Sequence, residues 1–197
     1  MSTLLWILFS FLCGALPFSI WISQLAGADP RNVGDRNPGA TNALKAGGWK
    51  PGLAVLLLDV SKAAAPVGLA YQLFGLRGFG MLAVALAPML GHAYSPFLHF
   101  KGGKALATTL GVWIGLTFWD VPLVALAGVV FWFLLLKNSG WTVLLTLLGM
   151  GAYLIWFRPE SLLLQVLGAQ AVLLLWKHRF DLRQNPLARF TARQEKA

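Results

Sequence analysis

Long apolar runs recur along the whole chain and are interrupted by glycine, proline and charged residues. Hydrophobic residues make up 57% of the 197 residues and charged residues only 12%, which is too few to cover the surface of a water-soluble domain. A helix needs about 20 apolar residues to cross the hydrocarbon core of a bilayer. The sequence therefore predicts an all-α integral membrane protein in which residues 1–197 form a single domain.

Seven apolar segments are predicted to be transmembrane helices. Several are shorter than the ~20 residues of a perpendicular span, and one break depends on a tight turn at Trp119-Asp120-Val121-Pro122. Without that turn the number of helices would be six. Because no Lys or Arg precedes the first segment, we interpret it as a retained helix rather than a signal peptide. The predicted helices cover about residues 4–25, 52–74, 78–98, 105–119, 121–136, 141–157 and 161–176.

Basic residues are unevenly divided between the two sides of this arrangement. The sixteen Lys and Arg outnumber seven Asp and Glu, and the positive side of a membrane protein is normally cytoplasmic. Two basic residues, Arg77 and Arg158, lie on one side, and Lys62 lies within a span. The N-terminus is therefore predicted outside and the C-terminus, with a basic tail over 176–197, in the cytoplasm. The other thirteen are Arg31, Arg36, Lys45, Lys50, Lys101, Lys104, Lys137, Lys177, Arg179, Arg183, Arg189, Arg193 and Lys196.

The same composition limits the partners that the chain is expected to have. A net charge of +9 would suggest nucleic acid in a soluble protein, but here the anionic cytoplasmic leaflet of the bilayer explains it, so no nucleic-acid partner is expected. A single cysteine, Cys13, excludes an internal disulfide framework. We find no spaced Cys and His ligands, so no metal is expected. No cofactor is expected either.

Two glycine-containing loops, both predicted to be cytoplasmic, are candidates for binding phosphate. Residues 32–48 form the first loop and Lys101-Gly102-Gly103-Lys104 the second. Glycine allows a ligand to approach the backbone, and successive N–H groups can form a concave anion site. The second loop also leads into a helix start at Ala105, where the helix dipole favours an anion. The alternative is that both loops are ordinary turns carrying the positive charges of the cytoplasmic side.

Two charged residues within the second predicted helix are candidates for a functional pair. An ionisable side chain inside a span is costly to insert and commonly functional. Asp59 and Lys62 are spaced i, i+3, so they share a helix face and can form an ion pair; a purely structural pair is the alternative. His92, at the cytoplasmic end of the third helix, is a better site candidate than His99. For His178, at the start of the tail, contact with lipid headgroups is the simpler explanation.

These residues resemble the bacterial acyl-phosphate:glycerol-3-phosphate acyltransferases (PlsY) over most of the chain. The resemblance is specific because three separate motifs occur in order within the predicted helical frame. Those motifs are Gly27-Ala28-Asp29-Pro30-Arg31-Asn32-Val33-Gly34 with Asn37-Pro38-Gly39-Ala40-Thr41-Asn42, then Asp59-Val60-Ser61-Lys62, and then Gly91-His92 with Phe100-Lys101-Gly102-Gly103-Lys104.

The resemblance implies an enzyme of the bacterial inner membrane, multi-pass and with its active site facing the cytoplasm. It would transfer a fatty acyl group from acyl phosphate to the 1-hydroxyl of glycerol 3-phosphate, giving lysophosphatidic acid and phosphate. The residues predicted to act in catalysis are Lys104, Asn37 and His92. Those predicted to bind phosphate are Gly34, Asp35, Arg36, Gly39, Thr41, Asn42, Lys45, Lys62, Lys101, Gly102 and Gly103. Those predicted to support the site structurally are Asp29, Arg31 and Asp59.

The chain departs from the family pattern at several of these positions. The family usually has Gly-Ser-Gly-Asn where this chain has Gly34-Asp35-Arg36-Asn37, and Asp181 stands where asparagine is typical. Two other functions therefore stay open. One is a catalytically weak paralogue that binds a phosphate-bearing lipid or metabolite. The other is a small anion transporter, which the crowding of polar residues at one face disfavours.

Overall fold

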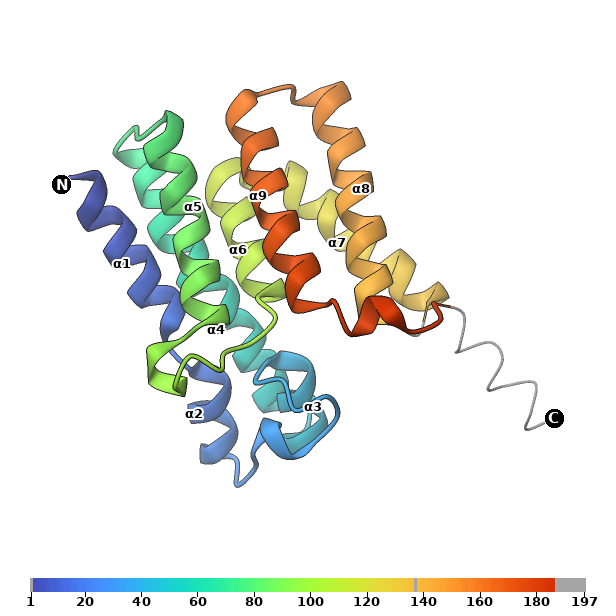
Figure 1. The fold of residues 1–197 in the computed structure, drawn as a ribbon. Coiled ribbons are helices and arrows are strands. Elements are labelled where there is room, and N and C mark those ends of the chain that lie inside the picture. The colour runs from blue at the N-terminus through green and yellow to red at the C-terminus, as the bar shows by residue number, and fades with distance from the viewer. Residues whose placement is uncertain (1, 137, 187–197) are drawn as a thin grey trace. The chain divides into compact units, whose positions relative to one another are not determined.

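The computed structural model describes residues 2–136 and 138–186, and within them all regular secondary structure is helical. The chain divides into two compact units, Met1–Leu116 and Thr117–Ala197, which are described separately. Each of the seven predicted segments contains helix (Figure 1). Lys137 and the part of the predicted basic tail over 187–197 lie outside the described residues.

Unit 1 contains most of the polar motifs. In Figure 1 its elements are coloured from blue to yellow-green. They are α1 (Thr3–Ala15), α2 (Phe18–Leu25), η1 (Pro30–Asn32), α3 (Ala40–Gly47), α4 (Trp49–Gly68), the π-helical turn η2 (Leu69–Leu73), α5 (Gly78–Ala93), η3 (Pro96–Leu98) and α6 (Leu106–Thr117), whose last residue belongs to unit 2.

The first predicted helix is in fact two helices separated by a break at Leu16-Pro17. Proline has no N–H and restricts the residue before it to extended backbone; Leu16 accordingly has ψ 123°. The break leaves the Leu16 carbonyl without a helical partner, and Lys62 Nζ donates a hydrogen bond to it over 2.9 Å. The predicted segment over 4–25 is therefore two helices rather than one continuous helix, and Pro17 is the physical cause of the break.

The first polar loop also differs from the prediction, because part of it is helical. Residues 40–47 form α3, which packs closely on the start of α4: a Cβ added at Gly52 would lie 2.8 Å from the Leu44 Cα. Alanine and leucine within this stretch favour helix, whereas the surrounding Gly and Asn suggested a continuous loop. Because α3 is ordered against α4, it holds Thr41, Asn42 and Lys45 in fixed positions relative to one another.

Helices α1 and α5 approach each other at glycines. A Cβ added at Gly14 would lie 2.1 Å from the Pro88 carbonyl oxygen, and one at Gly91 would lie 2.1 Å from the Phe11 carbonyl oxygen. Small residues allow helix backbones to come this close in membrane proteins. The close packing fixes the position of His92, which follows Gly91 at the end of α5.

Substituting Gly91→Ala is expected to destabilise the protein by about 1–3 kcal/mol, because the added carbon would meet backbone atoms of α1 that cannot rotate away. Thermal unfolding of purified protein in detergent, followed by tryptophan fluorescence, measures the effect. Gly149→Ala is the matched control, since its Cβ would meet nothing within 4 Å in α8. Equal melting temperatures for the two variants would contradict the proposed close packing.

The described part of unit 2 contains three apolar helices and a short 3-10 turn. They are α7 (Asp120–Leu135), α8 (Ser139–Phe157), α9 (Ser161–Lys177) and η4 (Asp181–Arg183). Helix α6 ends at Thr117 and α7 begins at Asp120, so the predicted turn near residue 120 is present. Asn138 caps α8, because its Oδ1 accepts hydrogen bonds from the N–H groups of Gly140 and Trp141.

Among the described residues, four helical stretches are long and apolar enough to cross a membrane: Thr3–Leu25, Trp49–Leu73, Gly78–Leu98 and Ser139–Phe157. The segments Leu106–Thr117, Asp120–Leu135 and Ser161–Lys177 are apolar but shorter. Many large apolar side chains, such as Leu57, Leu134 and Val172, are exposed, as expected for surfaces that face lipid rather than water.

Candidate functional site

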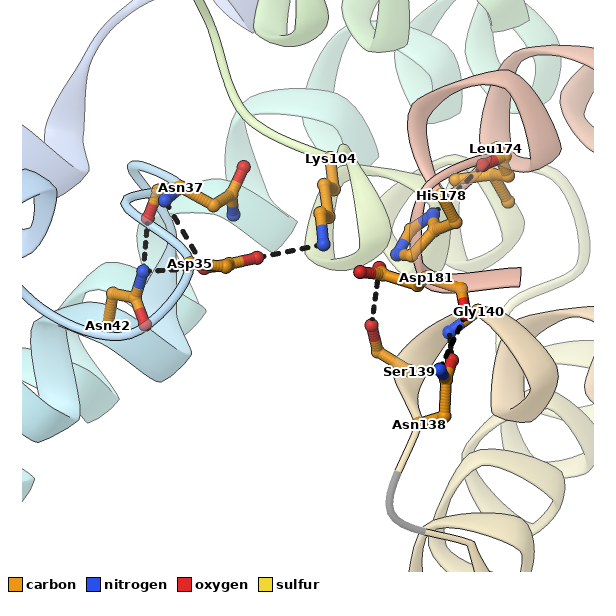
Figure 2. Close-up of polar contacts among 10 residues, drawn as sticks. All are labelled: Asp35, Asn37, Asn42, Lys104, Asn138, Ser139, Gly140, Leu174, His178 and Asp181. Carbon is orange, nitrogen blue, oxygen red and sulfur yellow. Dashed lines mark hydrogen bonds and ion pairs between the residues drawn. The ribbon is translucent and has the colours of Figure 1, made fainter. Parts of the chain in front are cut away.

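The two polar loops of unit 1 meet at an ion pair. Lys104 Nζ lies 2.8 Å from Asp35 Oδ2, which joins the second loop to the first (Figure 2). The Asp35 carboxylate also accepts hydrogen bonds from the Asn42 side-chain amide over 2.8 Å and from the Asn37 N–H over 3.2 Å. The structure therefore brings together four residues that the sequence assigned to phosphate binding or catalysis.

The charge of this cluster depends on Lys104. Partial burial by itself would raise the pKa of the Asp35 carboxyl, but the hydrogen bond and the positive charge of Lys104 outweigh it, and hydrogen bonds from Asn42 and Asn37 add to their effect. The pKa of Asp35 is therefore lowered from its ordinary value, and the group is a carboxylate at neutral pH.

The turn of the first loop is tightly built around Asn42. Gly34 has φ +56°, a left-handed conformation that glycine adopts without strain. A Cβ at Gly34 would lie 2.6 Å from Asn42 Oδ1 and 3.2 Å from Lys45 Nζ. Asn42 is buried, and its amide also donates to the Asn37 carbonyl over 3.0 Å. These contacts place the Lys45 ammonium close to the Gly34 backbone.

The second loop is held against His92. Gly103 N–H donates to the His92 carbonyl over 3.1 Å. A Cβ at Gly102 would lie 1.9 Å from that carbonyl oxygen, and one at Gly103 would lie 2.2 Å from His92 Nε2. Both glycines thus allow close packing on the end of α5. The Gly103 amide is paired with a protein acceptor in this conformation, so it does not form the open donor site that the sequence suggested.

The predicted start of α6 is also displaced. The helix begins at Leu106 rather than Ala105, and Ala105 has φ +63°. This left-handed residue separates Lys104 from the first helical turn. The expectation that the loop runs directly into a helix at Ala105 was therefore wrong. The helix begins one residue later, and the left-handed Ala105 changes the direction of the backbone before it.

The buried pair predicted within α4 is present. Lys62 Nζ lies 2.6 Å from Asp59 Oδ1, and the two side chains are 3% and 2% exposed. Lys62 Nζ also lies 2.9 Å from His92 Nδ1, and His92 Nδ1 lies 3.8 Å from Asp59 Oδ1. Since Lys62 also caps Leu16, one ammonium links α4, α5 and the break between α1 and α2.

A small pocket lies where these elements converge in unit 1. Its lining combines the α1–α2 break, the first loop at Pro38, the buried network and the second loop at Gly103. Ser19 and Ser95 in its wall donate hydrogen bonds to the carbonyls of Pro38 and Ala15, respectively. The lining residues are Gly14, Ala15, Leu16, Pro17, Ser19, Pro38, Lys62, His92, Ser95, Leu98 and Gly103.

Other predicted site residues lie farther out or make local contacts. Asp29 and Arg31 form an ion pair of 2.6 Å, and the Asp29 side chain caps the turn η1. The hydrogen bond from Arg31 lowers the pKa of Asp29 from its ordinary value. Gly39 precedes α3 as its N-cap. The remaining residues, Arg36, Thr41 and Lys101, are exposed.

A polar cluster in unit 2 was not predicted from the sequence. Ser139 Oγ donates to Asp181 Oδ2 over 2.8 Å, and the Asn138 amide donates to the Asp181 carbonyl (Figure 2). Trp141 Nε1 donates to the Gln184 carbonyl over 3.0 Å. The segment after α9 is thereby attached to the start of α8. Asn138-Ser139, a typical N-cap sequence before an apolar run, indicates the start of α8 but not its contact with Asp181.

The interpretation of His178 was wrong. The side chain is completely buried, and its Nδ1 lies 2.9 Å from the Leu174 carbonyl one turn earlier. It is therefore buried rather than extended toward lipid headgroups.

Comparisons with known proteins identify relatives of the chain. A family model described as glycerol-3-phosphate acyltransferase matches residues 4–185. The glycerol-3-phosphate acyltransferase of Idiomarina loihiensis is 35% identical over 196 residues, covering 99% of this chain and 95% of that protein. The one from Nitratidesulfovibrio vulgaris is 44% identical over 128 residues, covering 64% of this chain and 39% of that protein. The chain thus matches less than half the length of the latter.

A solved structure has the same fold. The crystal structure of PlsY, an integral membrane glycerol 3-phosphate acyltransferase in its glycerol 3-phosphate form, matches with a TM-score of 0.84 and 31% identity, covering 92% of this chain and 90% of that one. Its lysophosphatidic acid form matches with the same TM-score and 30% identity.

Proposed function

The chain belongs to the glycerol-3-phosphate acyltransferase family, and on that premise we propose that it transfers a fatty acyl group from acyl phosphate to the 1-hydroxyl of glycerol 3-phosphate. The products are lysophosphatidic acid and phosphate. The observation that carries the proposal is the meeting of Lys104 with the loop at Asp35. It joins a cation to amide donors within unit 1, and Pro38 and Gly103, which adjoin these residues in sequence, line the pocket.

The chemistry requires little of the protein beyond position and charge. Acyl phosphate is an activated mixed anhydride. The glycerol oxygen forms a bond to the acyl carbon, the bond from that carbon to the phosphate oxygen breaks, and the departing phosphate accepts the hydroxyl proton. Orientation of the two substrates and stabilisation of the developing negative charge are then the main sources of rate.

The roles of individual residues follow from their positions. Lys104 and Lys45 hold glycerol 3-phosphate, and Lys104 also stabilises the developing charge. Asn37, Asn42 and the backbone around Gly34 hold the phosphate of the donor. Thr41, Gly39 and the exposed cations Arg36 and Lys101 contribute donors and positive charge at the mouth of the site. Packing of Gly102 and Gly103 on His92 determines the conformation of the second loop. The His92 ring is held in place by its contacts with Lys62 and Asp59.

The proposed setting is the bacterial inner membrane. All seven apolar helices cross it in this proposal, with the N-terminus outside and the site facing the cytoplasm. The excess of basic residues on one side supports this orientation. An acyl chain would lie among the helices while both phosphates stay at the aqueous surface.

An assay with purified protein tests the activity. With a long-chain acyl phosphate and radiolabelled glycerol 3-phosphate, we expect lysophosphatidic acid and phosphate in equal amounts. With acyl-CoA or acylated acyl carrier protein as donor, we expect no product. Product from acyl-CoA at an equal rate would overturn the donor assignment. Binding of glycerol 3-phosphate without product from any of these donors would favour the weak paralogue, and uptake of the anion into proteoliposomes would favour the transporter.

A further inference from the structure

The Asp35 carboxylate occupies a set of donors that suits a phosphate. It accepts from an ammonium, a side-chain amide and a backbone N–H, which come from Lys104, Asn42 and Asn37. These groups are the ones that bind phosphate oxygens in proteins, and a charged acceptor strengthens each hydrogen bond. The chain therefore supplies an anion of its own to the donors that the proposed function assigns to substrate.

We propose that Asp35 competes with the substrate phosphate for Lys104 and its neighbouring donors, and that it thereby sets the affinity of the site for its anionic substrate. This inference rests on the proposed function, because it assumes that these donors bind a substrate phosphate. It adds a specificity-determining residue whose effect is to weaken anion binding rather than to strengthen it.

A substrate phosphate and the Asp35 carboxylate cannot both contact Lys104 without lying close to each other. Lys104 Nζ lies 2.8 Å from Asp35 Oδ2, so a phosphate oxygen at a similar distance from Nζ can lie at most about twice that distance from the carboxylate. Two anions at this separation repel each other unless enough positive charge lies between them. Binding of phosphate to Lys104 is therefore favoured when Asp35 leaves.

Exposure shows which partner can move. The Asp35 side chain is 48% exposed, whereas that of Lys104 is 19% exposed. A half-exposed carboxylate can turn toward water at little cost, because water then replaces its protein donors. The more enclosed Lys104 would stay in place and receive the substrate.

Asp35 could instead be a positioning residue that holds Lys104 ready for the substrate. The two roles predict opposite effects of removing the charge. If Asp35 competes, anion binding becomes tighter. If Asp35 positions Lys104, binding becomes weaker.

The test is binding of glycerol 3-phosphate, and of inorganic phosphate as a second probe, to the full-length protein in detergent by isothermal titration calorimetry. Asp35→Asn keeps the shape and an acceptor for the Asn37 N–H but removes the charge. We expect its Kd for glycerol 3-phosphate to fall by about fivefold or more, because the binding-competent state no longer has to displace an internal anion. Asp35→Ser, with a different shape, should give the same direction of change.

Two further proteins make the test specific. In a Lys104→Gln background, Asp35→Asn should change the Kd by less than about twofold, because the pair through which Asp35 acts is gone. Glu160→Gln, which removes a carboxylate in unit 2, should leave the Kd of the otherwise unchanged protein as it was. A gain of similar size in Glu160→Gln would mean that net charge alone is responsible, and it would overturn the proposal.

The outcomes also separate this inference from the proposed function. An unchanged or raised Kd in both Asp35 variants overturns the inference, even if the protein forms lysophosphatidic acid. Tighter binding in the variants supports it, even if neither protein catalyses acyl transfer. Absence of measurable anion binding in the unchanged protein and in both variants overturns it as well.

Discussion

Lys104→Ala is expected to lower kcat/KM for acyl transfer by about 100- to 1,000-fold, the loss seen when one preorganised donor to a developing charge is removed. The reason is the position of its ammonium, 2.8 Å from Asp35 at the junction of the two loops. The variant also leaves the carboxylate of Asp35 without its cation, so the site becomes negative where both substrates carry phosphate. Initial rates of lysophosphatidic acid formation over a range of glycerol 3-phosphate concentrations measure the effect.

Lys50→Ala is the matched control for this variant. Lys50 is an exposed lysine at the start of α4, with its ammonium 5.9 Å from the centre of the Trp49 ring. Its loss changes the net charge equally but leaves the loop junction intact, so kcat/KM should change by less than about twofold. Rates for Lys104→Ala that match those of Lys50→Ala would remove Lys104 from the mechanism.

The helical frame was predictable because apolar composition and membrane thickness together limit the choices. Local backbone chemistry decided the details that were missed. Pro17 interrupts the first helix, and a proline between apolar residues does not show whether a helix bends or breaks. Helix α3 was missed because Gly and Asn surround a short helix-favouring stretch, and its order depends on packing against α4.

The site was predictable where spacing along one helix fixes the geometry. Asp59 and Lys62 could be paired from their i, i+3 positions, and the structure confirms the pair. The partner of Asp35 could not be predicted in this way. Arg36 is its neighbour in sequence, yet the ion pair is with Lys104, far along the chain. Position in space, which sequence spacing does not give across loops, decides that choice.

The burial of His178 shows the same limit from the opposite direction. The sequence places it among basic residues beyond an apolar helix, which is typical of a surface position. In the structure its Nδ1 lies 2.9 Å from the Leu174 carbonyl of α9, and the side chain has no exposed area. Hydropathy along the chain does not report this burial.

Lys62→Met is expected to destabilise the protein by about 3–5 kcal/mol, the usual cost of removing one member of a buried ion pair. Three contacts are lost together: the ion pair with Asp59, the hydrogen bond to the Leu16 carbonyl and the contact with His92. Asp59 would remain buried as an uncompensated charge. The free energy of unfolding, measured in mixed micelles of increasing denaturing detergent, gives the size of the effect.

The double variant Asp59→Leu with Lys62→Met separates the charge from the other contacts. Replacing both members of a buried pair by apolar residues is often close to neutral, so at least half of the lost stability should return. Lys50→Met, on the same helix but exposed, should change the free energy of unfolding by less than about 0.5 kcal/mol. If the double variant were as unstable as Lys62→Met, the unpaired carboxylate would not be the cause, and the cap on Leu16 or the contact with His92 would be the dominant contribution of Lys62.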